Sequence, residues 1–474
     1  MNKNHFSTIL LAFIASLMMI GCAVGPDYVR PEMEIAAEYR EPTEGWKYAT
    51  PADDQLLSET WWTLYQDGTL NTLVTAIDVD NQNLKATEAR YRQARALLAA
   101  AQANLFPTLD GGASANRAQS NIGNNRAAPS NQYNVSLNAA WDVDLWGRVR
   151  RDIEAQQANL ELSKAELDAL RLSLQTSLTQ AYFQLRVTDA RIALMDETVA
   201  AYQTSYEMTQ NRYNAGIVTR SDVSQALTQL ESARTHRIDL ELTRIQNENA
   251  LALLVGKTPA QFSLTVDRSI RLPLPKIPVA IPSEILERRP DIAASERAVA
   301  AANANIGVAQ AAFYPSLTLS ASGGYRSGHW SDWFDVPSRV WSLGASLAQF
   351  IFDGGQREAT LEAAVASYDA TVATYKQTVL SAFGEVENNL TALRVLDDEM
   401  RSQQATLRAA RETETLTINQ YKAGTTTYLN VVIAQTARLN AEDNQIQLRG
   451  RQLSATASLI NALGGGWHGI DTTP

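Results

Sequence analysis

The sequence predicts a mainly α-helical fold that also carries membrane β-barrel strands and is built from two copies of one unit. Three observations lead to this prediction: landmarks that recur at one fixed offset, segments with the two-residue period of strands, and helical stretches of unusual length. A duplicated unit determines how every other segment of the chain is interpreted.

Three landmarks recur with residue numbers that differ by 208 in every case, here called the repeat offset. The matching pairs are AQANLFP at 101–107 with AQAAFYP at 309–315, NRYNAG at 211–216 with NQYKAG at 419–424, and LVG at 254–256 with ALG at 462–464. One shared offset over such a distance indicates a duplication. We predict repeat 1 at 69–268 and repeat 2 at 284–474, each in the order helix, strand, strand, long helix, helix. A proline-rich connector at 269–283 would join them, because prolines at this density favour extended chain.

Each copy begins with a predicted helix. After the helix, apolar and polar residues alternate with a period of two. Residues 70–105 contain neither proline nor glycine and are predicted to form one helix, which Pro107 ends. Four strands are expected after the two helices, at about 107–117, 131–145, 315–326 and 339–352, with residues 119–130 as a loop. Alternating apolar and polar residues over about ten positions are typical of a tilted membrane strand.

The alternation also predicts which side chains of the second strand would face a water-filled lumen. These are Asn134, Ser136, Asn138 and Asp142. The loop of repeat 2 contains Trp330, Trp333 and Phe334, which are the residue types found where a membrane meets water.

A long helical hairpin is predicted after each strand pair, at 147–256 and 355–464. Residues 148–213 lack both proline and glycine, so one uninterrupted helix would be about 100 Å long. Asp144 and Asp353 stand where a strand gives way to a helix and are expected to cap it. Gly216 and Gly424 are expected to reverse the chain, since a left-handed position at a helix end costs glycine least.

Four strands cannot close a barrel within one chain, and an open sheet edge in lipid leaves backbone groups unpaired. Two chains would supply eight strands and three would supply twelve. An eight-stranded barrel is filled by its own side chains, whereas a larger one leaves an aqueous lumen, which suits the polar faces described above.

The segment 1–21 is expected to be a signal peptide, with an apolar core at 9–20 that is too short to cross a membrane as a helix. The sequence Met19-Ile20-Gly21-Cys22 resembles a lipobox, which predicts cleavage after Gly21 and acylation of Cys22. Residues 22–68 would be a lipidated tether to the outer membrane. An ordinary signal peptide followed by an incidental cysteine is the alternative.

Composition excludes several classes of function. The net charge of −10 disfavours nucleic acid as a partner, because binding to phosphates needs clustered lysine and arginine. The single cysteine and four scattered histidines provide no recognisable metal site, and no catalytic motif or cofactor motif is present. No cofactor, no metal and no enzymatic activity are therefore expected.

Several segments together resemble the TolC-like outer-membrane efflux channel family, in its branch of OprM/NodT-type lipoproteins. These segments are CAVGPDYVRP at 22–31, ERRPDI at 287–292, the Phe-Pro and Tyr-Pro pairs, the two Tyr-x-Ala-Gly turns, and ALGGGW at 462–467. The resemblance implies a homotrimer with a 12-stranded β-barrel on a 12-helix periplasmic α-barrel. It also implies a periplasmic adaptor (membrane fusion protein) and an inner-membrane transporter of RND type as partners.

The resemblance further implies that the ends of the two helical hairpins close the tunnel at rest and bind the adaptor. The corresponding residues are Arg212, Tyr213, Gly216, Ile217, Val218, Thr219 and Asp222 in the first hairpin, and Tyr421, Gly424, Thr425, Thr426, Thr427 and Asn430 in the second. Relatives often have an acidic residue near the second tip glycine, where this sequence has Thr426.

The expected function is therefore the outer-membrane exit duct of a tripartite pump for drugs and toxic compounds. Three alternatives stay open: a duct for type I protein secretion, a lipid-anchored periplasmic adaptor, and a structural lipoprotein of the cell wall. The long alternating strands disfavour an adaptor, because adaptors are expected to have compact β-domains instead.

Overall fold

The computed structural model describes residues 23–33, 60–119, 121–122, 125–126, 128–268, 272–275, 277 and 288–470. The expected signal peptide, Cys22, most of the tether and most of the connector lie outside these residues. The chain divides into two compact units. Unit 1 contains 23–33, 90–164 and 294–376, and unit 2 contains the other described residues, so the long helices α4 and α8 contribute to both.

The helices come in pairs that reproduce the repeat offset. The pairs are α3 (Gln82–Ala103) with α7 (Pro290–Ala311), α4 (Arg148–Asn214) with α8 (Gln356–Lys422), and α5 (Arg220–Leu254) with α9 (Tyr428–Ala462). In each pair the first residues and the last residues both differ in number by this offset. The prediction of two repeats in a mainly helical chain is thereby confirmed. The shorter elements are α2 (Gly68–Asp80), η2 (Trp61–Tyr65), η3 (Pro259–Gln261) and η4 (Val336–Ser338).

The prediction of one helix over 70–105 was wrong, because Asn81 separates α2 from α3. Its backbone is extended, with φ −64° and ψ 122°. Its side chain accepts a hydrogen bond from the Leu84 amide at 3.0 Å and donates one to the Leu254 carbonyl at 2.7 Å. The break between α2 and α3 costs backbone hydrogen bonds. The Asn81 side chain offsets this loss, because it caps α3 and also binds the distant Leu254 carbonyl.

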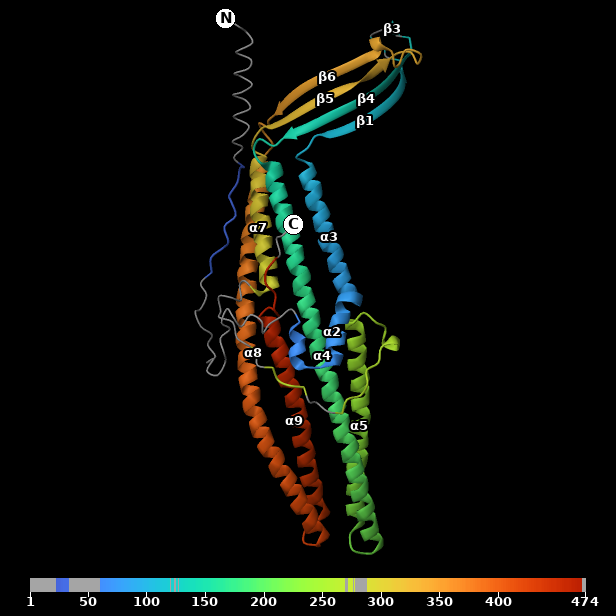
Figure 1. Ribbon diagram of the computed structural model, residues 1–474, viewed down its shortest axis with the longest axis vertical. Helices are drawn as coiled ribbons and strands as arrows, with labels where there is room; N and C mark the ends of the chain where they lie inside the picture. Colours follow the sequence, from blue (N-terminus) through green and yellow to red (C-terminus); the bar gives the residue numbers. More distant parts are fainter. Residues whose placement is uncertain are drawn as a thin grey trace. The chain divides into compact units, whose positions relative to one another are not determined.

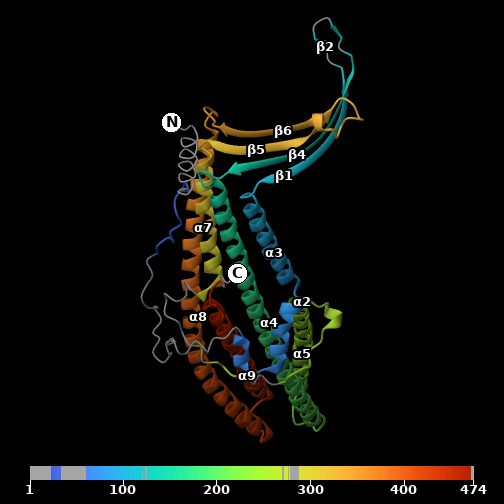
Figure 2. The same cartoon turned by 45° about the horizontal axis from the view of Figure 1, so that its top comes forward.

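Unit 1 contains a four-stranded antiparallel sheet in the order β1-β4-β5-β6 (Figure 1). The strands are β1 (Thr108–Ala118), β4 (Ser130–Val143), β5 (Ser316–Ser327) and β6 (Arg339–Ala348). The sheet is curved along its strands (Figure 2). β4 and β5 pair across the two repeats, from Tyr133 opposite Ser327 to Val143 opposite Leu317. The duplication therefore yields one continuous sheet rather than two separate hairpins.

Two details of the strand region differ from expectation. The expected loop at 119–130 contains a second short hairpin, formed by β2 (Asn121–Ile122) and β3 (Asn125–Arg126). Gly123 and Asn124 lie between them in the sequence, and such a residue pair favours tight hairpins. β6 ends at Ala348 instead of 352, and the Phe350 carbonyl there accepts a hydrogen bond from the Arg357 side chain.

Asp144 and Asp353 cap the helices that follow them, although each lies several residues before the first helical residue. Asp144 accepts hydrogen bonds from the amides of Val149 and Arg150, at 3.0 and 3.1 Å. Asp353 accepts from the amides of Gly355 and Arg357 at 3.1 and 3.3 Å, and its pKa is lowered chiefly by the Arg357 guanidinium. A carboxylate that binds the unpaired amides of a first turn stabilises the helix at its start.

In unit 2 the helices α8, α9, α4 and α5 lie side by side in that order (Figures 1 and 2). The largest buried side chains of this unit include Tyr65, Tyr182 and Phe183. Charged pairs link neighbouring helices: Arg191 of α4 binds Asp443 of α9 at 2.6 Å, and Arg244 of α5 binds the buried Asp189 of α4 at 2.7 Å. Over the described residues, no helix is long and apolar enough to cross a membrane.

Asn81→Ala is expected to lower the free energy of unfolding by about 1–2 kcal/mol, since it removes both the cap of α3 and the bond to Leu254. The midpoint of thermal unfolding, followed by circular dichroism in detergent, measures the loss. Asn83→Ala is the matched control, because Asn83 is exposed and lies within α3. Equal midpoints for the two variants would contradict the role of Asn81.

Candidate functional site

The register of the sheet sorts its side chains into an apolar and a polar face. On one face, Leu109, Ala139, Ala321 and Leu343 lie in one row across the four strands. Leu109 is 72% exposed and Leu343 is 76% exposed. Large aliphatic side chains on a sheet are rarely left this open to water, so this face is suited to contact lipid.

The opposite face carries the residues that the sequence analysis assigned to a lumen. Asn134, Ser136, Asn138 and Asp142 all lie on this face of β4, opposite Arg326, Gly324, Ser322 and Thr318 of β5. Polar side chains also bind one another here: the Thr318 hydroxyl donates to Asp142 at 2.6 Å, and Ser322 and Ser342 share a hydrogen bond of 2.8 Å. The face is therefore hydrophilic across three strands.

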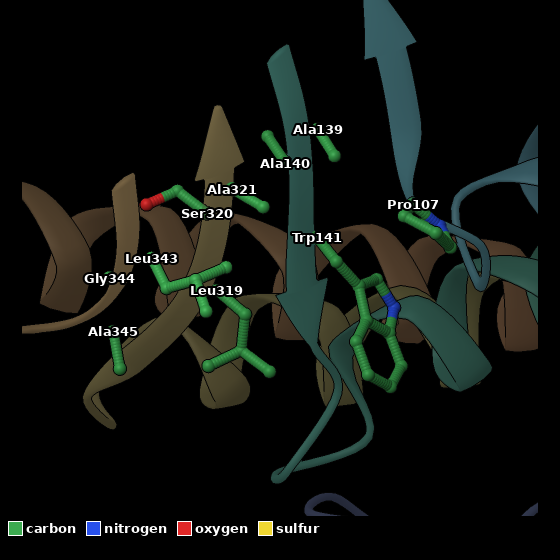
Figure 3. A pocket seen from close by; sticks show the side chains of 10 residues that line it. All are labelled: Pro107, Ala139, Ala140, Trp141, Leu319, Ser320, Ala321, Leu343, Gly344 and Ala345. Atoms are coloured by element: carbon green, nitrogen blue, oxygen red, sulfur yellow. The ribbon is translucent and has the colours of Figure 1, made fainter. Parts of the chain in front are cut away.

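A shallow depression of about 460 Å³ lies on the apolar side, near the ends of the strands that join the helices (Figure 3). Small side chains such as Ala139 and Ala321 line it together with the larger Trp141, Leu319 and Leu343. Apart from the Ser320 hydroxyl, the side chains that line it are apolar. The depression therefore belongs to the lipid-facing surface and offers no chemistry of its own.

Aromatic residues surround the sheet at both ends of its strands. At the end joined to the helices, Trp146 stacks on Tyr314 with ring centroids 4.7 Å apart, and its ring nitrogen donates to the Pro315 carbonyl. At the other end, Trp330, Trp333 and Phe334 pack against one another and around Tyr133 and Tyr325. Two aromatic belts separated by an apolar band are the pattern of a membrane strand region. Only the second belt was predicted from the sequence, although the tryptophan that follows the strand in repeat 1, Trp146, is a visible signal for the first.

The segment that follows Cys22 is bound to unit 1 by a small set of specific contacts. The Val24 amide donates to the Trp146 carbonyl at 3.0 Å, and Arg151 donates to the Val24 carbonyl and to Asp27. The Asn303 side chain donates to the Pro26 carbonyl at 3.0 Å. Neither Arg151 nor Asn303 was predicted to have a role, because both look like ordinary helix residues in the sequence.

Gly25 makes this close attachment possible. Its φ is +103°, and a Cβ built there would lie 2.5 Å from the Gly307 Cα. Tyr28 continues the contact by donating a hydrogen bond to Glu296, and burial followed by this bond raises the pKa of Tyr28. Ala23 is therefore held beside the end of the sheet that carries Trp146.

The predicted tip residues lie at the free ends of the two long hairpins in unit 2. Gly216 and Gly424 have φ values of +74° and +75°, as expected for chain reversal. The first turn is closed by a hydrogen bond from the Ile217 amide to the Arg212 carbonyl at 2.9 Å, and the second by one from Thr425 to Gln420 at 3.0 Å. The two turns therefore have the same backbone geometry.

The hairpins differ in how their return helices start. Thr219 and Asp222 form a capping box, in which each side chain binds the backbone amide of the other residue. At the equivalent place in the second hairpin, Thr427 makes no such bond, and Asn430 donates to the Thr426 hydroxyl at 2.8 Å. The start of α5 thus carries a charged side chain, Asp222. It is also stabilised by a capping box that the start of α9 lacks.

A buried aromatic cluster joins the two hairpins just behind the turns. Tyr421 and Tyr428 are both buried, with ring centroids 5.4 Å apart. Arg212 of the first hairpin lies over the Tyr421 ring at 4.7 Å and donates to the Tyr421 carbonyl at 3.1 Å. Burial, followed by the nearby Tyr421, Tyr202 and Asp222, raises the pKa of Tyr428 to about 12, so its hydroxyl stays protonated in the physiological range.

The structure therefore brings the predicted tip residues together at one end of unit 2 and the predicted lumen residues together on one face of unit 1. In the part of the chain that the structure describes, no group of three or more His, Cys, Asp or Glu side chains could hold a metal ion.

A two-faced sheet with aromatic belts, combined with long hairpins that end in matched turns, defines a subunit of a membrane channel with a long helical section. The chain belongs to the outer membrane efflux protein family, whose profile it matches at residues 73–257 and again at 281–465. The two matches are related by the same repeat offset as the sequence landmarks. The predictions of the family, of the two-repeat fold and of an outer-membrane location are confirmed.

Similar proteins cover almost the whole chain. The cation efflux system protein CusC of Escherichia coli O6:H1 is 30% identical over 97% of this chain and 99% of its own length. The probable efflux pump outer membrane protein TtgC of Pseudomonas putida is 30% identical over 99% of this chain and 96% of its own. The solved outer-membrane channel OprN is 32% identical, with a TM-score of 0.87 over 94% of this chain and 100% of that one.

The predictions about function and partners are confirmed at the level of the family. The chain is an outer-membrane efflux channel protein, and such channels form homotrimers that pair with a periplasmic adaptor and an inner-membrane RND transporter. The family consists of channel proteins rather than enzymes.

Arg212→Ala is expected to loosen the contact between the hairpins, because it removes a charged hydrogen bond and a cation–π contact worth together about 1–2 kcal/mol. The amides of residues 419–425 should then exchange with deuterium about tenfold faster, as measured by mass spectrometry. Arg220→Ala, an exposed arginine at the same tip, is the control and should leave exchange unchanged. Unchanged exchange in Arg212→Ala would show that the aromatic cluster holds the hairpins alone.

Proposed function

We propose that three copies of this chain close into the exit duct of a tripartite efflux pump, through which small toxic molecules leave the cell passively. The observation that carries the proposal is the four-stranded sheet, which has an apolar and a polar face and whose outer strands, β1 and β6, each have one strand partner within the described residues. A sheet of this kind satisfies its edges in a membrane by closing with further copies.

The hydrophilic face supports three copies rather than two. Eight strands would leave an interior just wide enough for side chains to fill, whereas twelve leave an aqueous lumen. Asn134, Ser136, Asn138 and Asp142 would line this lumen. Their neighbours in the register are Ser, Thr, Asp and Arg side chains and two glycines, and the side chains are compatible with water but too polar for a packed interior.

Acylation of Cys22 after cleavage at Gly21 would anchor each subunit in the inner leaflet of the outer membrane. The contacts of Val24, Asp27 and Arg151 support this proposal. They hold Ala23, the residue after Cys22, beside the aromatic belt at the end of the sheet that joins the helices. A lipid on Cys22 could then enter the membrane without stretching the chain, since consecutive Cα atoms are about 3.8 Å apart.

The hairpin tips are proposed as the contact for the adaptor. Tyr213, Ile217 and Thr219 are exposed at the first turn, and Thr425 and Asn430 are exposed at the second. Tyr421 lies inside the aromatic cluster, so it would act by holding the hairpins together rather than by touching the partner. An exposed isoleucine beside polar groups is a surface of the type that packs against another helix.

Small molecules are proposed as the cargo because similar proteins include pumps named for toluene, solvents, antibiotics and cations. The duct itself would have no catalytic role and no cofactor, since a passive lumen needs only polar walls and an opening. The identity of the cargo would then be set by the inner-membrane transporter.

Native mass spectrometry of the protein extracted in detergent tests the assembly and the anchor together. We expect a trimer whose chains begin at Cys22 and carry the added mass of acyl groups. A monomer would refute the duct, whereas a trimer with unmodified Cys22 would refute only the lipid anchor.

Labelling of single cysteines tests which face of the sheet meets water. Ser136→Cys should react with a water-soluble maleimide in proteoliposomes, while Leu137→Cys should react only after the protein is dissolved in SDS. The two positions are adjacent on β4 and point to opposite faces, so each is the control for the other. Equal labelling of both in proteoliposomes would contradict a lipid-facing apolar side.

A further inference from the structure

Two arginines lie on the apolar face of the sheet. Side chains of one strand point to the same face at every second position, so Arg117 of β1 shares the face of Leu109. By the same rule, Arg339 of β6 shares the face of Leu343. Both arginines are exposed. A guanidinium on a lipid-facing surface is costly at the middle of a membrane and is tolerated at the level of the headgroups.

Both arginines lie at the end of the sheet that carries the hairpin of β2 and β3, here called the outer end (Figure 2). Arg117 is the last residue but one of β1, and Arg339 is the first residue of β6. The channels of this family cross the outer membrane and extend into the periplasm with their helices. The outer end is the end away from the helices, so it meets the outer leaflet of that membrane.

The charged residues of the four strands are divided between the two faces of the sheet. Asp110, Asp142 and Arg326 lie on the polar face, in the rows of Asn138, Thr318 and Asn134. Among the residues of these strands, Arg117 and Arg339 are the charged residues of the apolar face. The apolar face is therefore positively charged at its outer end and uncharged along the rest of its strands.

The arginines at the other end of the sheet are neutralised within the chain. Arg150 binds Asp144 at 3.2 Å, and Arg357 binds Asp353 at 2.6 Å. Within the part of the chain that the structure describes, no carboxylate forms an ion pair with either arginine of the outer end. Their charge is therefore available to an anion that does not belong to this chain.

Aromatic side chains surround Arg339. Tyr325 lies directly opposite it on β5, and Trp341 follows it by two positions on the same face of β6. Phe334 packs against Tyr325 with ring centroids 5.5 Å apart. Trp341 is 77% exposed and Phe334 is 64% exposed. Exposed rings at a membrane boundary can pack against acyl chains and against the C–H faces of sugar rings.

The anion that this chemistry fits is a phosphate on a sugar headgroup. A guanidinium binds phosphate through two parallel hydrogen bonds, which an ammonium group cannot form. In the outer leaflet of a bacterial outer membrane, phosphates of this kind belong to lipopolysaccharide, whose lipid A headgroup is a phosphorylated disaccharide. Arginine for the phosphate and aromatic rings for the sugar and the acyl chains are the groups that such a lipid requires.

We propose that the outer end of the apolar face binds the phosphorylated sugar headgroup of lipopolysaccharide. Arg117 and Arg339 bind its phosphates, and Trp341 packs where the sugars join the acyl chains. β1 and β6 are the edge strands of the sheet, so the lipid binds along the boundaries between subunits. The proposal rests on the proposed function, in which the apolar face meets the membrane, and adds the lipid that this face recognises.

Native mass spectrometry of the full-length protein in detergent, with purified lipids added, measures this binding. Bisphosphorylated lipid A should bind more tightly than monophosphorylated lipid A. Phosphatidylglycerol, which is anionic but has no sugar, should bind more weakly than either form of lipid A. This comparison uses the unaltered protein, so it decides the question even if a variant fails to assemble.

The double variant Arg117→Gln with Arg339→Gln should weaken the binding of bisphosphorylated lipid A about fivefold or more, because it removes two charged contacts at an exposed surface. Arg326→Gln is the matched control. Arg326 is exposed at the same end of the sheet but lies on the polar face, so its replacement should leave the affinity unchanged.

Equal affinities of the double variant and the unaltered protein, both seen as trimers, would overturn the site and leave the duct intact. Equal binding of lipid A and phosphatidylglycerol would overturn the assignment to lipopolysaccharide. A monomer of the unaltered protein would overturn the duct, and with it the lipid-facing surface on which this proposal rests.

Discussion

The outer edges of β1 and β6, which have no strand partner within the described residues, are the constraint on which the rest of the molecule depends. Lipid offers the backbone groups of these edges no hydrogen bonds, so the sheet is complete only when another chain supplies the next strand. The continuous pairing of β4 with β5 makes this possible, because it joins the two repeats into one sheet with two open edges. Oligomerisation is therefore a requirement of the strand region rather than an addition to it.

The helices also favour association between chains, but through the burial of apolar surface rather than through backbone hydrogen bonds. In the described part of unit 2, α5 and α8 carry exposed aliphatic side chains, among them Leu242 and Val395. Burying Leu242 and Val395 between chains would remove apolar area from water, at about 25 cal/mol for each Å². Hydrogen bonds in the sheet and hydrophobic contact between the helices thus favour the same assembly.

The helices of the two long hairpins have matching bounds, but the ends of the hairpins differ in charge. The capping box of Thr219 and Asp222 has no equivalent at Thr427 and Asn430. Arg212, whose counterpart in repeat 2 is Gln420, binds across to the second hairpin. Arg212 of the first hairpin therefore helps to hold the end of the second, whose return helix lacks a side-chain cap at Thr427.

The sequence by itself determined the duplication, the strand segments, the long helices and the glycine turns, because each depends on local periodicity or on backbone preference. The break at Asn81 was not determined in this way, since its side chain caps α3 and also donates to the carbonyl of Leu254, which is far away in the sequence. The hydrogen bonds of Arg151 to the Val24 carbonyl and of Asn303 to the Pro26 carbonyl likewise depend on the fold, which brings these distant residues together. Only the tertiary structure decided which faces remain uncovered, because exposure depends on how distant elements pack and not on the residues of one helix or strand.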